Sequence, residues 1–152
     1  MMTEDSIFMR AALDEAEKAR ALGEVPIGAV IVRNGEIVSA AHNLRETDKN
    51  AAAHAELLAI ERACEALSTW RLSDCTLYVT LEPCPMCAGA IINARIKRVV
   101  FGSFDEKAGA CGSVCNLFAM PFNHRPALSG GVEEEKCTEL LQIFFKQLRN
   151  RR

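Results

Sequence analysis

The sequence has no apolar run long enough to cross a bilayer. Its longest, such as "IGAVIV" at residues 27–32, falls far short of the roughly 20 residues that a spanning helix needs. The N-terminus, "MMTEDSIFMR", has no basic segment followed by a long apolar stretch, so no signal peptide is predicted. Together these absences predict a cytoplasmic protein with no membrane partner.

The sequence also has little net charge and no even set of cysteines. The formal net charge is −2, so no general basic field is present to attract nucleic acid. Two local basic segments remain, residues 95–98 and 146–152, and composition alone favours an exposed, solvated surface for both. The seven cysteines are an odd number in a chain without an export signal, which favours metal binding or burial over a disulfide framework.

The chain contains enough apolar sequence for one folded domain. It has 152 residues, of which 49% are hydrophobic and 25% charged, a profile typical of globular proteins. No internal repeat, low-complexity tract or linker divides it, so residues 1–152 are expected to form a single domain.

Hydrophobic periodicity predicts alternating strands and helices. Helices are expected over residues 6–22, 53–67, 84–95 and 133–149, and strands over 76–81, 97–103 and 127–129. Residues 25–43 are typical of a hairpin that turns at Asn34-Gly35, and a long loop at 105–126 is expected to include a short helix near 113–118. In the second helix the apolar stripe is predicted to contain Leu57, Ile60, Cys64 and Leu67.

This order of elements indicates an α/β fold with three layers, α/β/α. A central mixed sheet of about five strands would carry helices on both faces. The strands at 76–81 and 97–103 should be parallel, because a helix separates them, and their connection should be right-handed.

One group of residues suggests a metal site. Two motifs, "HAE" at residues 54–56 and "PCPMC" at 83–87, bring together His54, Glu56, Cys84 and Cys87. His54 is expected to share the buried stripe of its helix, and the two cysteines should face the same way on the first turn of theirs, with Pro83 as its first residue. The helix dipole there favours thiolates, and two thiolates with one imidazole select zinc. Three protein ligands leave a fourth position open for water, as in catalytic zinc sites.

Each part of this pattern has an ordinary alternative. A lone histidine near a helix start is more often a partly buried structural residue, and a lone C-x-x-C is more often redox-active or structural. Glu56 alone would be interpreted as a solvated carboxylate on a first helical turn. The combination of all four residues is far more specific than any of them.

H-x-E followed by P-C-x-x-C is the signature of the zinc-dependent base deaminases. The chain resembles this family along nearly its whole length, and most closely its bacterial tRNA adenosine deaminases. The similar stretches include "VPIGAVIV", "YVTLEPCPMCAGAI", "RVVFGSFDEKAGACGS", "FNH" and "FFKQLR". One stretch departs from the family: residues 50–53 are "NAAA", where the family often has Asp-Pro-Thr-Ala at the rim of the site.

The resemblance implies a cytidine deaminase-like fold, one Zn²⁺ per subunit and a homodimer, with no nucleotide cofactor. The partner would be a tRNA anticodon stem-loop, in which adenosine becomes inosine at the wobble position. His54, Cys84 and Cys87 would hold the zinc, which activates a water molecule, and Glu56 would carry protons without binding the metal.

The resemblance also implies substrate contacts, each with an ordinary alternative. Asn43 would hydrogen-bond the flipped nucleoside, or else be a plain strand-end asparagine. Asp105 would lie near the ribose, or else cap a loop. Phe145 and Arg149 would flank the RNA on the last helix, with core packing as the alternative for Phe145 and its neighbour Phe144.

Two rival functions remain open at the sequence level. One is deamination of a free base or nucleoside of the guanine or cytosine type, against which the basic ending and "FDEKAGACGS" argue only through the resemblance. The other is a binding module with a structural zinc, against which Glu56 argues. Cys111, Cys115 and His124 suggest a second metal site only weakly, because their spacing lacks the paired C-x-x-C form, and Cys64 and Cys75 are expected in the core.

Overall fold

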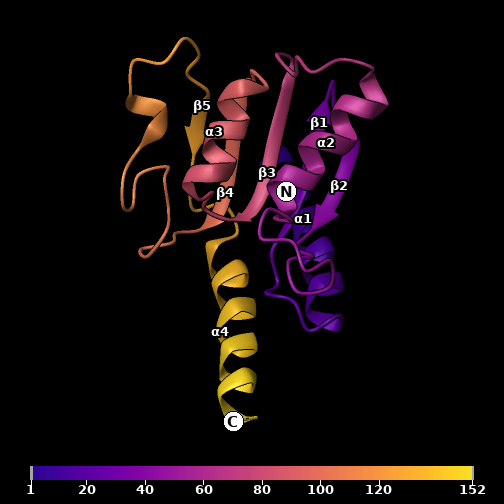
Figure 1. The fold of residues 1–152 in the computed structure, drawn as a ribbon, viewed down its shortest axis with the longest axis vertical. Helices are drawn as coiled ribbons and strands as arrows, with labels where there is room; N and C mark the ends of the chain where they lie inside the picture. Colours follow the sequence, from indigo (N-terminus) through magenta and orange to yellow (C-terminus); the bar gives the residue numbers. More distant parts are fainter. Residues whose placement is uncertain (1, 152) are drawn as a thin grey trace.

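The computed structural model describes residues 2–151, which form one five-stranded sheet flanked by helices (Figure 1). The elements along the chain are α1 (Glu4–Ala21), β1 (Gly28–Arg33), β2 (Glu36–His42), α2 (Ala55–Leu67), β3 (Cys75–Leu81), α3 (Pro85–Asn93), β4 (Arg98–Ser103), the 3₁₀ helix η1 (Leu117–Ala119), β5 (Ala127–Ser129) and α4 (Glu134–Asn150).

The sheet is mixed and its strand order is β2-β1-β3-β4-β5. β1 is antiparallel to both β2 and β3, whereas β3, β4 and β5 are parallel to one another. The register pairs Leu81 with Ser103, so the carboxyl ends of β3 and β4 lie side by side. The predicted mixed sheet and the parallel β3–β4 pair are confirmed.

Two apolar clusters, one on each face of the sheet, hold the three layers together. One cluster contains Ala59 and Ile60 of α2 and Ile91 of α3, packed on Leu77 and Val99 of the sheet. The other contains Met9 and Ala12 of α1 and Cys137 of α4. Helices α2 and α3 therefore cover one face and α1 and α4 the other, as the three-layer prediction requires. The C-terminal part of α4 extends away from the body of the molecule (Figure 1).

In the N-terminal half the predicted hairpin turn is confirmed, and the first helix starts two residues earlier than predicted. Asn34 and Gly35 have φ values of 52° and 77°, which is the type I′ hairpin turn predicted for this pair. Helix α1 begins at Glu4, two residues before the predicted start, because the side chain of Thr3 accepts a hydrogen bond from the amide of Ser6.

Three sequence predictions about the helices need correction. The fully buried residues of α2 are Ala55, Glu56, Ala59, Ile60 and Ala63. Of the predicted stripe, Ile60 is among them, Cys64 and Leu67 are partly buried against the same core, and Leu57 does not belong to that cluster. Helix α3 begins at Pro85 and not at residue 84, because Cys84 is its N-cap. The short helix expected near residues 113–118 is instead η1, a single 3₁₀ turn that starts at Leu117.

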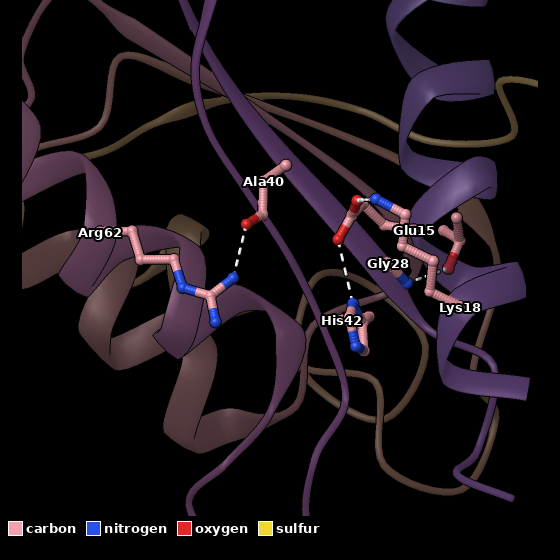
Figure 2. Close-up of polar contacts among 7 residues, drawn as sticks. Glu15, Lys18, Gly28, Ala40, His42 and Arg62 are labelled. Atoms are coloured by element: carbon pink, nitrogen blue, oxygen red, sulfur yellow. Dashed lines mark hydrogen bonds and ion pairs between the residues drawn. The ribbon is translucent and has the colours of Figure 1, made fainter. Parts of the chain in front are cut away.

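Helix α1 lies very close to strand β1 at Gly28. A Cβ atom on Gly28 would lie 2.0 Å from the carbonyl oxygen of Ala12 and 2.5 Å from the amide nitrogen of Ala16. Beside this contact Glu15 accepts a hydrogen bond from Lys18, one turn later on α1, and another from His42, which links α1 to the end of β2 (Figure 2). Across residues 2–151, no helix combines the length and apolar character that a bilayer-spanning segment requires.

Candidate active site

The candidate site lies where two helices start beside the carboxyl ends of parallel strands, a common place for ligands in α/β sheets. His54 is the N-cap of α2, and Cys84 is the N-cap of α3, with Cys87 in the first turn of α3. The prediction that His54 lies on the helical stripe was therefore wrong: its backbone is extended, and the side chain approaches from the helix start. Pro85, and not Pro83, is the first helical residue of α3.

Three potential metal ligands meet at this point. The Nδ1 atom of His54 lies 3.6 Å from the sulfur of Cys84 and 3.6 Å from the sulfur of Cys87. Zinc bonds of about 2.3 Å to sulfur and about 2.0 Å to nitrogen, at tetrahedral angles, would separate the two ligand atoms by about 3.6 Å. Within residues 2–151 this is the one group of three His, Cys, Asp or Glu side chains whose ligand atoms all lie within 4.8 Å of one another. The three residues therefore fit a zinc ion.

The two thiols have opposite acidities. A hydrogen bond from Cys87, together with one from His54, lowers the pKa of Cys84 to about 4 despite its partial burial. The same hydrogen bond to Cys84, together with burial, raises the pKa of Cys87. These shifts favour the thiolate at Cys84 and the protonated thiol at Cys87. A metal bound by both sulfurs would displace the proton of Cys87.

Glu56 lies on the first turn of α2 and is almost fully buried, with 4% of its surface exposed. Burial is the largest effect on this carboxyl group and raises its pKa to about 7. A carboxyl group of that acidity can both take and give a proton at neutral pH, as general acid–base catalysis requires.

A pocket of about 240 Å³ opens beside these residues. Its wall comes from several segments that are far apart in the sequence: Val25, Ile27, Asn43, Arg45, His54, Ala55, Glu56, Leu81, Glu82, Cys84, Asp105, Ala108 and Phe145. The volume lies below the 300–1,000 Å³ typical of sites for drug-sized ligands, so it suits a single heterocyclic base.

Asn43 offers this pocket an unused acceptor. Its side chain is 5% exposed, and its Oδ1 atom has no hydrogen-bond partner within residues 2–151. Because a buried polar atom without a partner costs free energy, such an atom at a pocket wall marks a place for a ligand donor. The backbone amide of Asn43 donates to the carbonyl of Ile27, which fixes the residue at the end of the hairpin.

The other predicted contact residues lie in the pocket and in a groove beside it. Asp105 and Phe145 line the pocket, and Phe145 is 41% exposed, whereas its neighbour Phe144 is 9% exposed and packs inside. Arg149 is not in the pocket. It lies in an adjoining hollow on α4 that also includes Lys107, Leu141 and Phe145. A third and larger hollow, of about 700 Å³, lies between the two. It shares Asp105, Ala108 and Phe145 with the pocket, and Lys107 with the hollow on α4.

Three residues of the site were not found by the sequence reasoning: Arg45, Glu24 and Glu82. Arg45 lines the pocket. The fully buried Glu24 accepts hydrogen bonds from the amides of Glu46 and Thr47, in the loop that leads to His54. Glu82, directly after β3, does the same for the loop after β4. For the two glutamates the only local signal in the sequence was a carboxylate beside a strand or turn, which usually indicates solvent exposure.

The remaining cysteines lie elsewhere. Cys75 is fully buried at the start of β3, and Cys64 is partly buried against the same core, in agreement with prediction. The Nε2 atom of His124 lies 2.7 Å from the carbonyl oxygen of Ile96, whereas Cys111 is buried and Cys115 exposed.

Comparison with known proteins gives a consistent result. The MafB19-like deaminase family matches residues 3–149. The tRNA-specific adenosine deaminase of Bacillus subtilis is 55% identical over 152 residues, which cover 99% of this chain and 94% of that protein. A structure from a study of A-to-I editing by tRNA:A34 deaminases at the wobble position is 44% identical, with a TM-score of 0.86 over 89% of this chain and 99% of that one.

A more distant likeness concerns the guanine deaminase of Bacillus subtilis. It is 33% identical, with a TM-score of 0.64, and the match covers 99% of this chain and 95% of that one. Identity is therefore clearly higher to the tRNA-specific relative. By its match to the family over residues 3–149 and its identity to that relative, the chain belongs to the MafB19-like deaminases and, among them, to the tRNA-specific adenosine deaminases.

Proposed function

We propose that this protein hydrolytically deaminates adenosine to inosine in tRNA, at the wobble position of the anticodon. The observation that carries the proposal is the pocket. It joins Glu56 and two members of the His54, Cys84 and Cys87 group to the unused acceptor of Asn43, in a space that suits one base. A target in an unpaired anticodon loop can leave its stack and enter at low cost.

His54, Cys84 and Cys87 are the proposed ligands of one zinc ion per chain. Their 3.6 Å separations suit tetrahedral coordination, and three protein ligands leave one position for water. When bound there, zinc would lower the pKa of a water molecule and so supply a nucleophile at neutral pH. Because His54 caps α2 and Cys84 caps α3, the ligands are fixed by the starts of two helices that pack on the sheet.

Glu56 is the proposed proton carrier. It lines the same pocket as Asn43, and burial raises its pKa to about 7. The carboxylate takes the proton of the attacking water and passes it to the ring nitrogen beside the reacting carbon. Glu56 then takes the second proton from the hydroxyl group that has added to the carbon and gives it to the amine. The C=O bond forms as the C–N bond breaks, and ammonia leaves.

The remaining proposed contacts would select the substrate. The Oδ1 atom of Asn43 would accept a hydrogen bond from the bound nucleoside, and Asp105 would lie at its ribose. Phe145 offers an exposed ring on which a flanking base can stack, a contact worth roughly 1–3 kcal/mol per base. Arg149 and Lys107, in the hollow next to Phe145, would contact phosphates.

The rival activity is deamination of free guanine or another free base. The pocket and the proposed zinc ligands would serve that chemistry equally well. The exposed Phe145 and the cationic hollow on α4 favour the RNA, because a free base has neither neighbours to stack nor phosphates to neutralise.

The deciding experiment compares kcat/KM for an anticodon stem-loop with kcat/KM for free adenosine, cytidine and guanine. We expect inosine to form efficiently in the stem-loop and the three small molecules to react poorly. Equal or higher efficiency on any free base or nucleoside would contradict the proposal and favour the rival.

We also propose that the protein is a cytoplasmic homodimer. A tRNA substrate agrees with that location. The side chains of Met86 on α3 and of Val114 and Met120 in the segment between β4 and β5 are apolar and exposed, so a second copy could cover them. Analytical ultracentrifugation gives the mass in solution, and a monomer at micromolar concentration would contradict the dimer.

A further inference from the structure

Glu82 is a buried carboxylate without a cation. Only 2% of its surface is exposed, and none of the ion pairs formed within residues 2–151 includes it. Such a group is costly unless hydrogen bonds replace the lost water. Its Oε1 atom accepts from the amide of Asp105 at 3.1 Å and from the hydroxyl of Ser113. Its Oε2 atom accepts from the amides of Cys111 at 3.0 Å and Ser113 at 3.1 Å.

All four donors belong to the loop of residues 105–113, which follows β4. This loop provides Asp105 and Ala108 to the pocket wall. The Oδ1 atom of Asp105 accepts from the amides of Lys107 and Ala108, so the first turn of the loop moves with Asp105. The amide of Ala110 also donates to the carbonyl of Pro83 at 2.8 Å. The loop is therefore attached to residues 82–83, which immediately precede the proposed ligand Cys84.

Gly109 provides an independent sign of how closely the loop packs on this carboxylate. A Cβ atom at Gly109 would lie 2.4 Å from both Cδ and Oε2 of Glu82 and 2.5 Å from the carbonyl oxygen of Asp105. Contacts this short cannot exist, so any larger residue would force the loop away from Glu82. The loop can approach the carboxylate only because residue 109 has no side chain.

We propose that Glu82 is a positioning residue for the substrate: it holds the 105–113 loop at a fixed distance from Cys84 and thereby sets the width of the base pocket. Glu82 exchanges no proton with the substrate and binds no metal. It acts through Asp105, Lys107 and Ala108, whose places depend on it. The inference deepens the proposed function and rests on it for the identity of the substrate.

The test replaces Glu82 by Gln, which keeps the shape but presents an NH₂ group to backbone donors. We expect hydrogen exchange of residues 104–116 to accelerate by about tenfold or more, which corresponds to about 1.4 kcal/mol. The KM for the anticodon stem-loop should rise by at least a similar factor and kcat by much less. Zinc content and the exchange of α2 and α3 should match the wild type.

Two further variants keep the result interpretable. Ser113→Ala removes only one of the four donors from an exposed residue, so it should change the same quantities in the same direction but less, even if Glu82→Gln folds poorly. Asp5→Asn is the matched control. Its carboxylate accepts from Tyr78 and from Arg98, the first residue of β4, so its loss should lower stability without raising KM.

The outcomes separate this inference from the proposed function. If wild-type protein leaves the stem-loop unchanged, the proposed function is wrong, and the exchange of residues 104–116 still decides whether Glu82 holds the loop. If the wild type is active, unchanged exchange or unchanged KM in Glu82→Gln overturns the positioning role. Loss of zinc together with faster exchange throughout α2 and α3 would indicate a general structural role and would overturn it too.

Discussion

Gly28→Ala should destabilise the protein strongly, because the new methyl group has no space. At 2.0 Å from the carbonyl oxygen of Ala12, the methyl must gain about 1.4 Å to reach an ordinary contact of 3.4 Å. The obstructing atoms are mostly backbone atoms of α1, so the helix itself must move. That movement would disturb Met9, Ala12 and Ala16, which are fully buried against the sheet. Overpacking typically costs 1–3 kcal/mol, and a displaced helix puts this change at about 3 kcal/mol.

Gly89→Ala is the matched control, since it makes the same chemical change in open space. No heavy atom lies within 4 Å of its Cβ position, and Gly89 is inside α3, where alanine is favoured over glycine by about 0.5–1 kcal/mol. In a chain of this size 1 kcal/mol corresponds to about 2–4 °C in Tm. Calorimetry at equal zinc loading should therefore show Tm lower by about 6–12 °C for Gly28→Ala and slightly higher for Gly89→Ala.

An unchanged Tm for Gly28→Ala would refute the close approach of α1 to β1. Equal losses in both variants would show that steric contact with α1 is not the cause. The same displacement should also weaken the hydrogen bond between Glu15 on α1 and His42, the strand partner of Gly28 (Figure 2).

Four further predictions concern the site. Cys84→Ser should lower zinc content from the proposed one per chain and lower Tm, because the proposed metal would link two helices; undiminished zinc by elemental analysis would exclude this ligand. Glu56→Ala should keep its zinc and lose about a hundredfold or more in kcat, and near-normal turnover would exclude it as proton carrier. Burial alone would raise the pKa of Glu24, but hydrogen bonds from Thr47 and Glu46 outweigh it and hold that pKa below its usual 4.5. The ionised Glu24 therefore contributes fully to stability above pH 4.5, and this contribution is lost as pH falls through the folded-state pKa. The difference in unfolding free energy between wild type and Glu24→Gln should therefore shrink on acidification below pH 4.5, and a constant difference would contradict this. Arg149→Gln should reduce the slope of log K for the stem-loop against log salt by about 0.7, whereas an unchanged slope would leave Arg149 a solvated residue.

The sequence predicted the helices and strands well because they depend on local patterns, and two short motifs sufficed to predict that His54, Cys84 and Cys87 lie together. Every strand and all four long helices were placed to within a few residues, and the Asn34-Gly35 turn was correct. The errors at His54 and Cys84 are errors of helix boundary. Both residues are N-caps with extended backbone, and single-residue boundaries depend on capping geometry that periodicity does not encode.

The burial of Glu24 and Glu82 could not be predicted, because their hydrogen-bond partners are distant in the sequence. Glu24 looks like a surface residue after a helix, and its burial becomes evident only when residues 46–47 fold over it. Phe144 and Phe145 are the same residue type and neighbours on one helix, so residue type alone does not distinguish their roles. Their side chains nevertheless point about 100° apart around the helix axis. Only the packing of α4 on the sheet decides that Phe144 faces the core and Phe145 the pocket.

In the proposed site, the residues that carry the chemistry and the residues that select the substrate lie on different segments of the chain. This separation would let related deaminases share a reaction and differ in substrate. The proposed metal ligands and Glu56 lie at the starts of α2 and α3, which are fixed by the core of the sheet. Part of the remaining wall comes from residues at or near the ends of β1, β2 and β3. The rest comes from Arg45, Asp105 and Ala108 in the two loops held by Glu24 and Glu82, and from Phe145 on the exposed side of α4. Substitutions there alter no residue of those two helix starts, so we expect them to change the ligand geometry less than they change the wall. Selectivity for RNA over a free base should therefore change through residues 44–53, 105–113 and 145–149 long before the chemistry itself is lost.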